Sequence, residues 1–299
     1  MKVAVAGANG LIGSNLVRAL RARGDEVVPL VRNPRHPGEV RWDPRAGGEW
    51  TRALEGVDGI VNLAGANIGG KRWSEEYKKE MRDSRLQPTR ALVEAMRAAS
   101  RRPRVFVSAS AVGYYGDRGD DEVTEATPAG SDFLAGLCKD WEEEAGRAEQ
   151  LGVRTVLLRT GVVLDREDSA LAKMLPPFKA FLGGPIGSGR QWFPWIHIAD
   201  EVGLILWALE GSARGPVDAV SPAPVRMKEF ARALGRALHR PAVLPVPAFA
   251  LRLAVGEMAE VLLGGQRALP KKALDGGYRF RFDDVDRALQ DVLSRSASA

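Results

Sequence analysis

The chain has 299 residues, of which 45% are hydrophobic and 27% charged, and its formal net charge is +5. These values are typical of a globular protein with a large core, and no Lys/Arg block of the kind that follows nucleic-acid phosphates is present. No apolar run approaches the roughly 20 residues of a membrane-spanning helix. The composition therefore predicts a chain that binds neither nucleic acid nor membrane.

The first strand-like run, "KVAVAG", begins at Lys2 and leaves no room for a signal peptide ahead of it. The single cysteine, Cys138, excludes an internal disulfide. Both observations favour a cytoplasmic protein. The expected partner is a small molecule, and the expected state is a monomer or a homodimer.

Short β-branched runs alternate with helical patterns through the first two-thirds of the chain. Strands are predicted at residues 2–7, 26–31, 59–65, 104–110 and 154–164. Helices are predicted near residues 11–23, 74–100 and 132–150. This alternation predicts parallel pairing, with helices covering both faces of the sheet. The predicted fold class is α/β, a Rossmann-type doubly wound parallel sheet with a smaller, mostly helical C-terminal lobe.

The residue composition changes after Leu164. Residues 176–195, rich in Gly, Pro and aromatics, predict a long ordered loop. A helix follows at 197–210, with Asp200 as its expected cap, then a strand at 215–221. Residues 277–282 predict a late strand or an extended hook.

These patterns predict two domains. Residues 1–221 form the dinucleotide-binding domain, to which 166–196 add part of a substrate pocket. Residues 222–299 form a lobe over the carboxyl edge of the sheet.

A glycine pattern follows the first strand and opens the first helix. In "AGANGLIGSN", Gly7 permits a tight turn, Gly10 lets the backbone approach a pyrophosphate, and Gly13 lets helix and strand pack closely. The free N–H groups and positive dipole end of the helix attract the anion. The strand-turn-helix context makes a dinucleotide site the expectation and a purely structural turn the alternative.

The end of the second strand selects the dinucleotide. A carboxylate there would bind a ribose 2′-hydroxyl, whereas an arginine accommodates a 2′-phosphate. The chain reads "PLVRNP", with Arg32 and Asn33 and no carboxylate beside them. The expected cofactor is NADP(H), and a solvated strand-end arginine is the alternative.

Other strand ends should meet the same ligand, because ligands gather at the carboxyl edge of such sheets. Asp43 is expected near the adenine, and Val163 near the nicotinamide. The complete set of candidate cofactor-binding residues is Gly7, Asn9, Gly10, Leu11, Ile12, Gly13, Arg32, Asn33, Asp43, Leu63, Ala64, Gly65, Glu80, Arg85, Ser108 and Val163.

At this point the sequence resembles a known family. The glycine turn, "NLAG", "SASAVGYYG" and "RTGVVL" resemble the extended short-chain dehydrogenase/reductases, which include the NAD-dependent epimerase/dehydratase enzymes. "WSEEYKKEMRDSR", "GGPIGSGRQWFPWIHIAD" and "LLGGQRALPKKAL" narrow the resemblance to an atypical branch of epimerase-family oxidoreductases with its own C-terminal domain. The resemblance covers essentially the whole chain.

The resemblance implies a catalytic set of Ser, Tyr-x-x-x-Lys and an upstream Asn. Ser110 fits the serine, with Ser108 as runner-up. The tyrosine motif is absent, because alignment on Glu142 puts Leu134 in the tyrosine position and Cys138 in the lysine position. A neutral thiol cannot supply the field of an ammonium, so the usual proton relay is expected to be lost. The alternative interpretation is that Cys138 is a buried, unreactive residue.

Two compensations are conceivable. Arg85, which occupies the upstream Asn position, would replace the lost positive charge, with Glu80 holding it. Tyr114 would act as the acid from the loop after Ser110, or would only pack there. The candidate catalytic residues are therefore Ser110, Tyr114, Cys138 and Arg85.

The remaining candidates concern the substrate. Arg190 would bind an anionic group, Trp192 would form an apolar wall, and His197 would border the pocket or serve a structural role. No metal site is expected, since the three histidines lack metal-ligand spacing. The run "EEE" at 142–144 is expected on a solvated helix face.

The prediction is an NADP(H)-dependent oxidoreductase or epimerase that acts on a carbonyl or alcohol of a small, nucleotide-sugar-like substrate with an altered catalytic set. The alternative is a catalytically silent NADP(H)-binding sensor or scaffold.

Overall fold

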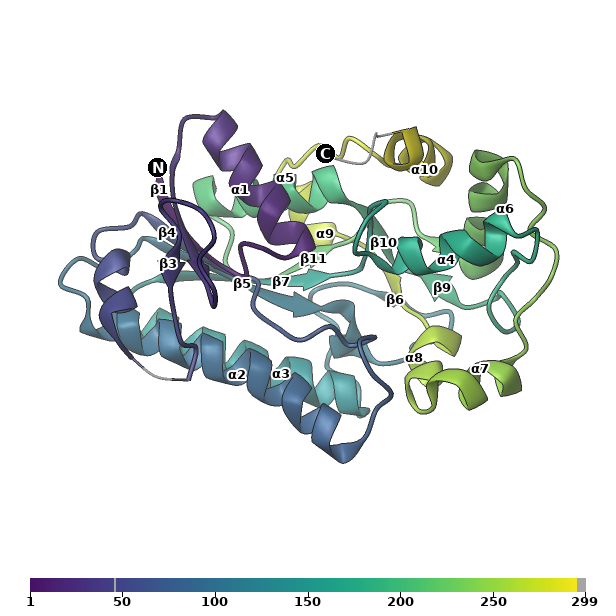
Figure 1. Ribbon diagram of the computed structural model, residues 1–299, viewed down its shortest axis with the longest axis horizontal. Coiled ribbons are helices and arrows are strands. Elements are labelled where there is room, and N and C mark those ends of the chain that lie inside the picture. The colour runs from purple at the N-terminus through teal and green to yellow at the C-terminus, as the bar shows by residue number, and fades with distance from the viewer. Residues whose placement is uncertain (46, 295–299) are drawn as a thin grey trace.

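The computed structural model describes residues 1–45 and 47–294. Its centre is a parallel seven-stranded sheet in the order β11-β7-β5-β4-β1-β2-β3 (Figure 1). The strands are β1 (Lys2–Ala6), β2 (Glu26–Val31), β3 (Val40–Arg41), β4 (Gly59–Asn62), β5 (Val105–Ala111), β7 (Arg154–Thr160) and β11 (Gly215–Ala219). The chain reverses its direction of travel across the sheet between β1 and β4, which makes this a doubly wound α/β fold. The predicted fold class is confirmed.

Helices cover both faces of the sheet. α1 (Leu11–Ala22) and α5 (Ile198–Glu210) lie on one face, and α2 (Glu75–Ala98) and α3 (Phe133–Gly146) lie on the other (Figure 1). The side chain of Ser74 caps α2, and that of Asp132 caps α3. Both caps satisfy N–H groups that the first helical turn leaves unbonded. Three 3₁₀ turns, η1 (Glu49–Leu54), η2 (Val112–Tyr115) and η3 (Arg147–Leu151), complete this part.

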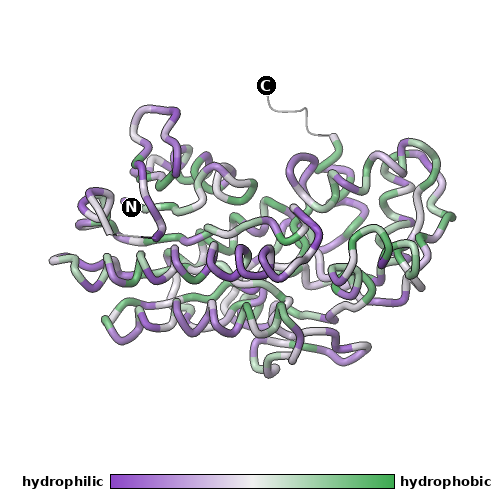
Figure 2. Tube along the Cα trace, turned by 60° about the horizontal axis from the view of Figure 1, so that its bottom comes forward, coloured by the Kyte–Doolittle hydropathy of each residue, from purple (hydrophilic) through white to green (hydrophobic). Residues whose placement is uncertain are grey.

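The core is divided by the sheet. One apolar cluster, including Val5 and Ile205, fills the α1/α5 face, and another, including Ile60 and Met96, fills the α2/α3 face. The central strands are buried on both sides and therefore read as continuous apolar runs. In Figure 2 hydrophilic and hydrophobic residues alternate along the helices, and hydrophobic residues also reach the outer edge at the end of the molecule away from the N-terminus.

The predicted strand at 154–164 is two strands. β7 stays in the main sheet, and β8 (Val162–Leu164) leaves it to pair with β10 (Trp195–His197). Gly161 makes the break possible, because a Cβ there would lie 2.3 Å from the Pro194 carbonyl oxygen. The sheet's carboxyl edge thereby opens toward the C-terminal region.

The expectation of a loop at 176–195 was partly wrong. α4 (Ala170–Lys179) runs into it, with Pro176 and Pro177 in its last turns, and β9 (Trp192–Phe193) pairs with β12 (Val225–Arg226). The Gly and Pro content predicted a loop, but α4 includes both prolines.

The C-terminal region is mostly helical, as expected. It contains α6 (Met227–Leu238), α7 (Ala248–Val255), α8 (Met258–Leu263), α9 (Lys271–Asp275) and α10 (Val285–Ser294). β13 (Arg267–Ala268) pairs with β6 (Glu122–Val123) from the first half of the chain. A third apolar cluster joins α4, α6 and α10. Of the lobe predicted at 222–299, residues 295–299 lie outside the described residues.

The predicted cap of α5 was wrong, and residues 277–282 form a hook rather than a strand. His197 caps α5 by accepting the N–H of Ala199 at its Nδ1 atom. Asp200 instead accepts the N–H groups of Arg281 and Phe282, at 2.8 and 3.0 Å. This carboxylate fixes the hook to the first turn of α5.

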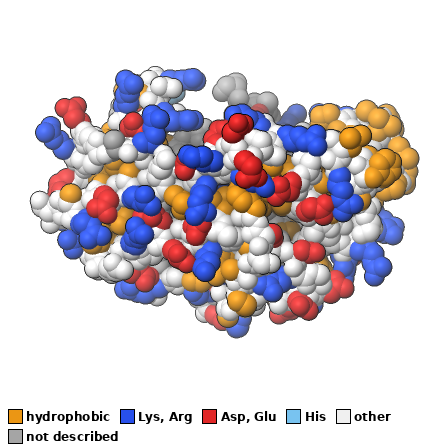
Figure 3. Space-filling model, turned by 90° about the horizontal axis from the view of Figure 1, so that it is seen from below, with side chains coloured by type: hydrophobic (Ala, Val, Ile, Leu, Met, Phe, Trp, Pro, Cys, Tyr) orange, Lys and Arg blue, Asp and Glu red, His pale blue; other side chains and the backbone are white. Residues whose placement is uncertain are grey.

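No helix in the described part of the chain is long and apolar enough to cross a bilayer. Basic and acidic side chains are interspersed over the face covered by α2 and α3 (Figure 3). Apolar side chains gather at one end of this face (Figure 3). On α7, Phe249 and Leu253 are 74% and 77% exposed.

Candidate functional site

The glycine turn joins β1 to α1 with no room for side chains. Gly7 has a φ of +79°, which favours glycine, and a Cβ there would lie 2.8 Å from the Leu63 backbone. A Cβ on Gly13 would lie 2.1 Å from the Gly7 carbonyl oxygen. Gly10 is the N-cap of α1 and provides no side-chain cap for its first N–H groups. Its first N–H groups therefore suit a diphosphate, as the sequence predicted.

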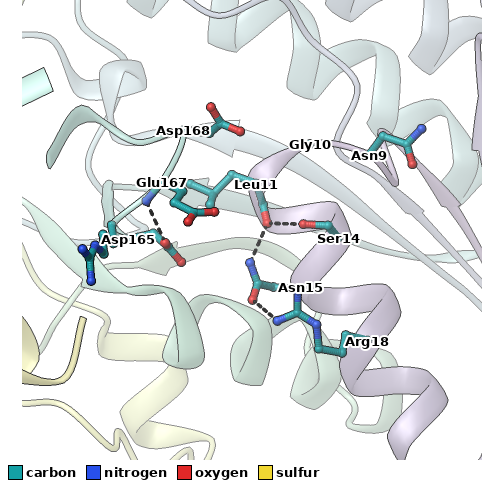
Figure 4. Close-up of a pocket in the computed structure, with 10 residues that line it drawn as sticks. Asn9, Gly10, Leu11, Ser14, Asn15, Arg18, Asp165, Glu167 and Asp168 are labelled. Carbon is teal, nitrogen blue, oxygen red and sulfur yellow. Dashed lines mark hydrogen bonds between the residues drawn. The ribbon is translucent and has the colours of Figure 1, made fainter. Parts of the chain in front are cut away.

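A pocket lies beside this turn (Figure 4). One wall is formed by Asn9, Gly10, Leu11 and the first turns of α1, and the other by the loop 165–168. The side chains of Ser14 and Asn15 both bond the Leu11 carbonyl. Sequence reasoning missed the loop, which has no local motif and reaches α1 only because β8 leaves the main sheet.

The ends of β2 and β3 lie side by side. The Trp42 N–H donates to the Val31 carbonyl at 3.1 Å, so Arg32 and Asp43 follow adjacent strand ends. Arg32 and Asn33 are exposed. Asp43 accepts two bonds from Arg45, and these bonds, first that of the backbone N–H, lower its pKa. Arg45 therefore opposes the negative charge of Asp43, the carboxylate that was predicted to lie near the adenine.

The loop after β4 approaches both the glycine turn and α2. Leu63 donates its N–H to the Ala6 carbonyl at 2.9 Å, and Ala64 donates to the Asn62 side chain at 3.2 Å. A Cβ on Gly65 would lie 3.3 Å from the guanidinium carbon of Arg85. The backbone of residues 63–65, which was predicted to contact the cofactor, therefore lies beside the Arg85 side chain.

Arg85 is held by backbone rather than by an acid. Its guanidinium donates to the carbonyls of Met81 and Ala66 at 2.9 and 3.0 Å and lies 5.2 Å from the centre of the Trp141 ring. Burial lowers its pKa, and Cys138 is the first group to oppose that shift. The expectation that Glu80 holds Arg85 was wrong, because Glu80 pairs with Lys71 at 3.0 Å.

Cys138 is buried on α3, with Ser110, Arg85 and Glu142 around it. Burial raises the pKa of the thiol to about 12, and the Glu142 charge adds to the shift. The Arg85 charge, the Ala111 N–H and the Ser110 side chain act in the opposite direction. A buried, protonated thiol is not a nucleophile, which agrees with the inert alternative.

Ser110 is 4% exposed, and its hydroxyl donates to Glu142 Oε1 at 2.7 Å. Ser108 is fully buried one pleat deeper. Tyr114 lies on η2, with the guanidinium carbon of Arg159 3.5 Å from its ring centre. Ser110 near the end of β5 therefore lies close to Cys138 on α3, which in turn is close to Arg85 on α2. Tyr114 is linked to Ser110 through Arg159 and Glu142.

Two functional candidates were missed. Glu142 and Arg159 form a buried pair with N–O distances of 2.8 Å, and the two side chains are 9% and 3% exposed. The solvated face expected for "EEE" was wrong for two of its three members, since Glu142 and Glu144 are buried. Their burial is explained by their partners: Arg159 pairs with Glu142, and Arg90 and Arg147 pair with Glu144.

The predicted substrate residues have different environments. Arg190 is exposed. The Trp192 ring lies near the guanidinium groups of Arg226 and Arg267, with ring-centre distances of 4.3 and 5.3 Å, and its Nε1 donates to Asp120. His197 is fully buried, caps α5 and contacts Asp291 at 3.1 Å. The structural alternative for His197 is the one these contacts support. In the part of the chain that the structure describes, no group of three His, Cys, Asp or Glu is placed to hold a metal ion.

Comparison with known proteins agrees with this arrangement. Residues 3–220 match the NAD dependent epimerase/dehydratase family, and residues 246–292 match a domain of unknown function, DUF1731. Epimerase family protein ML0860 of Mycobacterium leprae is 44% identical over 98% of this chain and 96% of its own.

Two solved structures are informative. Human epimerase family protein SDR39U1 (isoform 2), crystallised with NADPH, is 38% identical over 98% of this chain and 99% of its own, with a TM-score of 0.90. A nucleoside-diphosphate sugar epimerase from Corynebacterium glutamicum is 33% identical over 98% of this chain and 58% of its own, with a TM-score of 0.79. The chain described here is thus a member of the NAD-dependent epimerase/dehydratase family, as the resemblance implied.

Proposed function

We propose that this chain binds NADP(H) at the glycine turn and uses it to oxidise or reduce an alcohol or carbonyl group of a small molecule. The observation that carries the proposal is the turn itself, where Gly7 and Gly13 leave no space for a Cβ. Such contacts bring the backbone N–H groups of α1 within reach of a diphosphate. The presence of NADPH in the human relative supports the same cofactor here.

Arg32 supports NADP(H) over NAD(H). It is exposed beyond β2, and a guanidinium binds a phosphate with two parallel bonds. Asp43, at the adjacent strand end, is offset by Arg45 and does not leave an unopposed negative charge there. Both features suit a 2′-phosphate better than a bare ribose.

The proposed chemical centre is Ser110, with Arg85 as the cation that takes over from the missing lysine. When bound, the nicotinamide supplies a hydride acceptor or donor at its C4 carbon. Ser110 would form a hydrogen bond with the oxygen on the reacting carbon. Cys138 stands in the lysine position of the family motif, and Arg85 lies beside it. Epimerisation through a transient ketone is a variant of the same chemistry.

The substrate pocket is proposed between residues 1–221 and the lobe that begins near 222, with residues 166–196 as part of its wall. Arg190 and Trp192 are its proposed polar and apolar contacts. A nucleoside-diphosphate sugar is the first class to test, because the Corynebacterium glutamicum relative bears that name.

A catalytically silent sensor or scaffold is the second candidate. It is favoured by Leu134 and Cys138, which stand in the tyrosine and lysine positions and are 8% and 4% exposed. Neither side chain transfers a proton at neutral pH, since burial raises the pKa of Cys138 to about 12.

The test combines binding with turnover. NADPH fluorescence gives the dissociation constant, and Arg32→Ala should weaken NADPH about 10- to 100-fold while leaving NADH unchanged, since a charged bond contributes about 1.5–3 kcal/mol. Arg97→Ala, which replaces an exposed arginine in the last turn of α2, is the control. Equal loss for both nucleotides would contradict the assignment of Arg32.

A screen of alcohols and carbonyl compounds, followed by NADPH absorbance, separates the two candidates. Turnover that Ser110→Ala abolishes supports the enzyme, whereas tight binding without turnover supports the sensor. Absence of NADPH binding would refute both.

A further inference from the structure

Large apolar side chains are exposed at one end of the molecule. Eight such side chains are exposed in the part of the chain that the structure describes, and six of them belong to two loops and one helix. These six residues, called here the apolar end, are 47–77% exposed: Phe181, Leu182, Val243, Leu244, Phe249 and Leu253. Apolar side chains exposed in a group mark a binding surface, whereas single ones scattered over a surface do not.

The backbone of the apolar end is ordered by its own hydrogen bonds. The Leu244 N–H donates to the Gly183 carbonyl at 3.1 Å and so joins the two loops. α7 follows the second loop, and none of its eight residues is buried. α4, α6 and α7 lie at the same end of the molecule (Figure 1). Phe249 and Leu253, one turn apart on α7, therefore project from a regular helix.

The segments that carry the apolar end are strongly basic. Residues 170–190 and 227–255, which contain α4, α6 and α7, have eight Lys or Arg and one Asp or Glu. The whole chain has 43 Lys or Arg and 38 Asp or Glu, so its excess of positive charge lies in these two segments. Basic side chains lie next to apolar ones at this end of the molecule (Figure 3).

Two basic side chains adjoin the apolar end directly. The guanidinium carbon of Arg240 lies 4.5 Å from the centre of the Phe181 ring. Lys179 is exposed two residues before that ring, in the last turn of α4. Neither cation is paired with a carboxylate of the described residues. Both are therefore available to an anionic partner.

The carboxylates closest to α7 in the sequence have partners of their own. Glu257 lies 2.6 Å from the Lys78 ammonium, and Glu260 lies 2.7 Å from the Arg252 guanidinium. Because these negative charges are already offset, the field at the apolar end is positive. A positive surface attracts a negatively charged partner.

We propose that the apolar end docks on the surface of a bilayer that contains anionic lipid, with Phe249 and Leu253 inserted among the lipids and Lys179 and Arg240 at the headgroups. A side chain that is three-quarters exposed projects from the surface, which suits a soft partner that it can enter. Helices that combine apolar and basic side chains bind membrane surfaces without spanning them. The prediction of no membrane partner rested on the absence of a spanning run, which such a contact does not need.

Two other occupants fit this surface less well. A second copy docked through the same face would bring the basic segments of both copies together, and like charges oppose association. A folded acidic protein would satisfy the charge, but proteins bind one another through closely packed, complementary surfaces. Projecting side chains on two loops and a helix favour lipid.

Vesicle sedimentation with the full chain tests the proposal. Vesicles of phosphatidylcholine with about one-third phosphatidylglycerol should carry the protein down, and vesicles of phosphatidylcholine alone should bind it at least about tenfold more weakly. Raising the salt concentration from about 0.1 M to about 1 M should release most of the bound protein, because salt shortens the reach of the charges.

Variants separate the two parts of the contact. Phe249→Ser combined with Leu253→Ser should weaken binding to the anionic vesicles at least about tenfold, because it removes the inserted apolar surface. Lys179→Gln combined with Arg240→Gln should weaken it about 25-fold, since each basic side chain near an anionic bilayer contributes about fivefold.

Leu274→Ser is the matched apolar control, since Leu274 is 47% exposed on α9, which contacts β11. Arg97→Gln is the basic control, at an exposed arginine of α2. Both controls should sediment like wild type, and an unchanged melting temperature shows that each variant is folded. Failure to sediment with anionic vesicles, or equal losses in the controls, would overturn the proposal. So would a dimer that Phe249→Ser with Leu253→Ser dissociates in size-exclusion chromatography, or binding to a polyglutamate peptide without binding to vesicles.

Discussion

Replacement of Glu201 by glutamine should stabilise the protein at alkaline pH but not at acid pH. Glu201 lies in the first turn of α5 and is fully buried. Thr160 donates to its Oε1 at 2.8 Å, while its Oε2 has no partner among the described residues. Burial raises the pKa of this carboxyl to about 8. Glutamine has nearly the same shape, keeps an acceptor for Thr160 and carries no charge.

The sign and size follow from proton linkage. The folded chain holds the Glu201 proton more tightly than the unfolded chain, so stability falls as pH rises from the unfolded to the folded pKa and is constant above it. A pKa of about 8 in the fold against an ordinary value of 4.5 corresponds to a cost of about 5 kcal/mol above pH 8. Glu201→Gln removes that cost, and its advantage should nearly disappear near pH 4.5.

Urea unfolding of wild type and Glu201→Gln at about pH 5 and about pH 8.5 measures the difference. Asp218, another buried carboxyl with a pKa of about 8, is present in both proteins and cancels. Glu143→Gln, on an exposed side chain of α3, should change stability little at either pH. If Glu201→Gln gained no more at the higher pH than at the lower one, the reasoning from burial would be refuted.

Two further predictions use matched variants. Gly13→Ala should lower the melting temperature and abolish NADPH binding, because its Cβ would lie 2.1 Å from the Gly7 carbonyl oxygen; Gly136→Ala, on α3 with open space around it, should instead stabilise by up to about 1 kcal/mol. Iodoacetamide at about pH 8 should alkylate Cys138 about a thousandfold more slowly than a peptide thiol. Arg85→Met should slow that reaction further and Glu142→Gln should accelerate it, because their charges act on the thiol in opposite directions; equal rates in both variants would contradict the proposed cluster.

The fold followed from local signals. Continuous apolar strands alternating with amphipathic helices leave a doubly wound parallel sheet as the packing that buries both. The errors occurred where a distant segment decides the local structure. The bend at Gly161 depends on the Pro194 carbonyl, and the choice of His197 over Asp200 as cap depends on the hook at 281–282, which binds the aspartate.

The difference between local signals and distant contacts also explains which residues of the candidate site could be predicted. The glycine turn could be predicted because the residues that form it are close together in the sequence. Each of its glycines is required for a steric reason, the lack of space for a side chain. Glu142 could not, because a glutamate in a run of three is normally solvated and only a partner seventeen residues away makes its burial possible. Arg159 in turn stands at the end of a strand whose neighbour, β11, supplies Asp218 in register. A buried ion pair is costly unless every member is satisfied, so its presence behind Ser110, completed by three strands and a helix, is hard to explain by stability alone. What the arrangement fixes is the orientation of one hydroxyl, because Ser110 donates to the same Glu142 oxygen that accepts from Arg159 Nε.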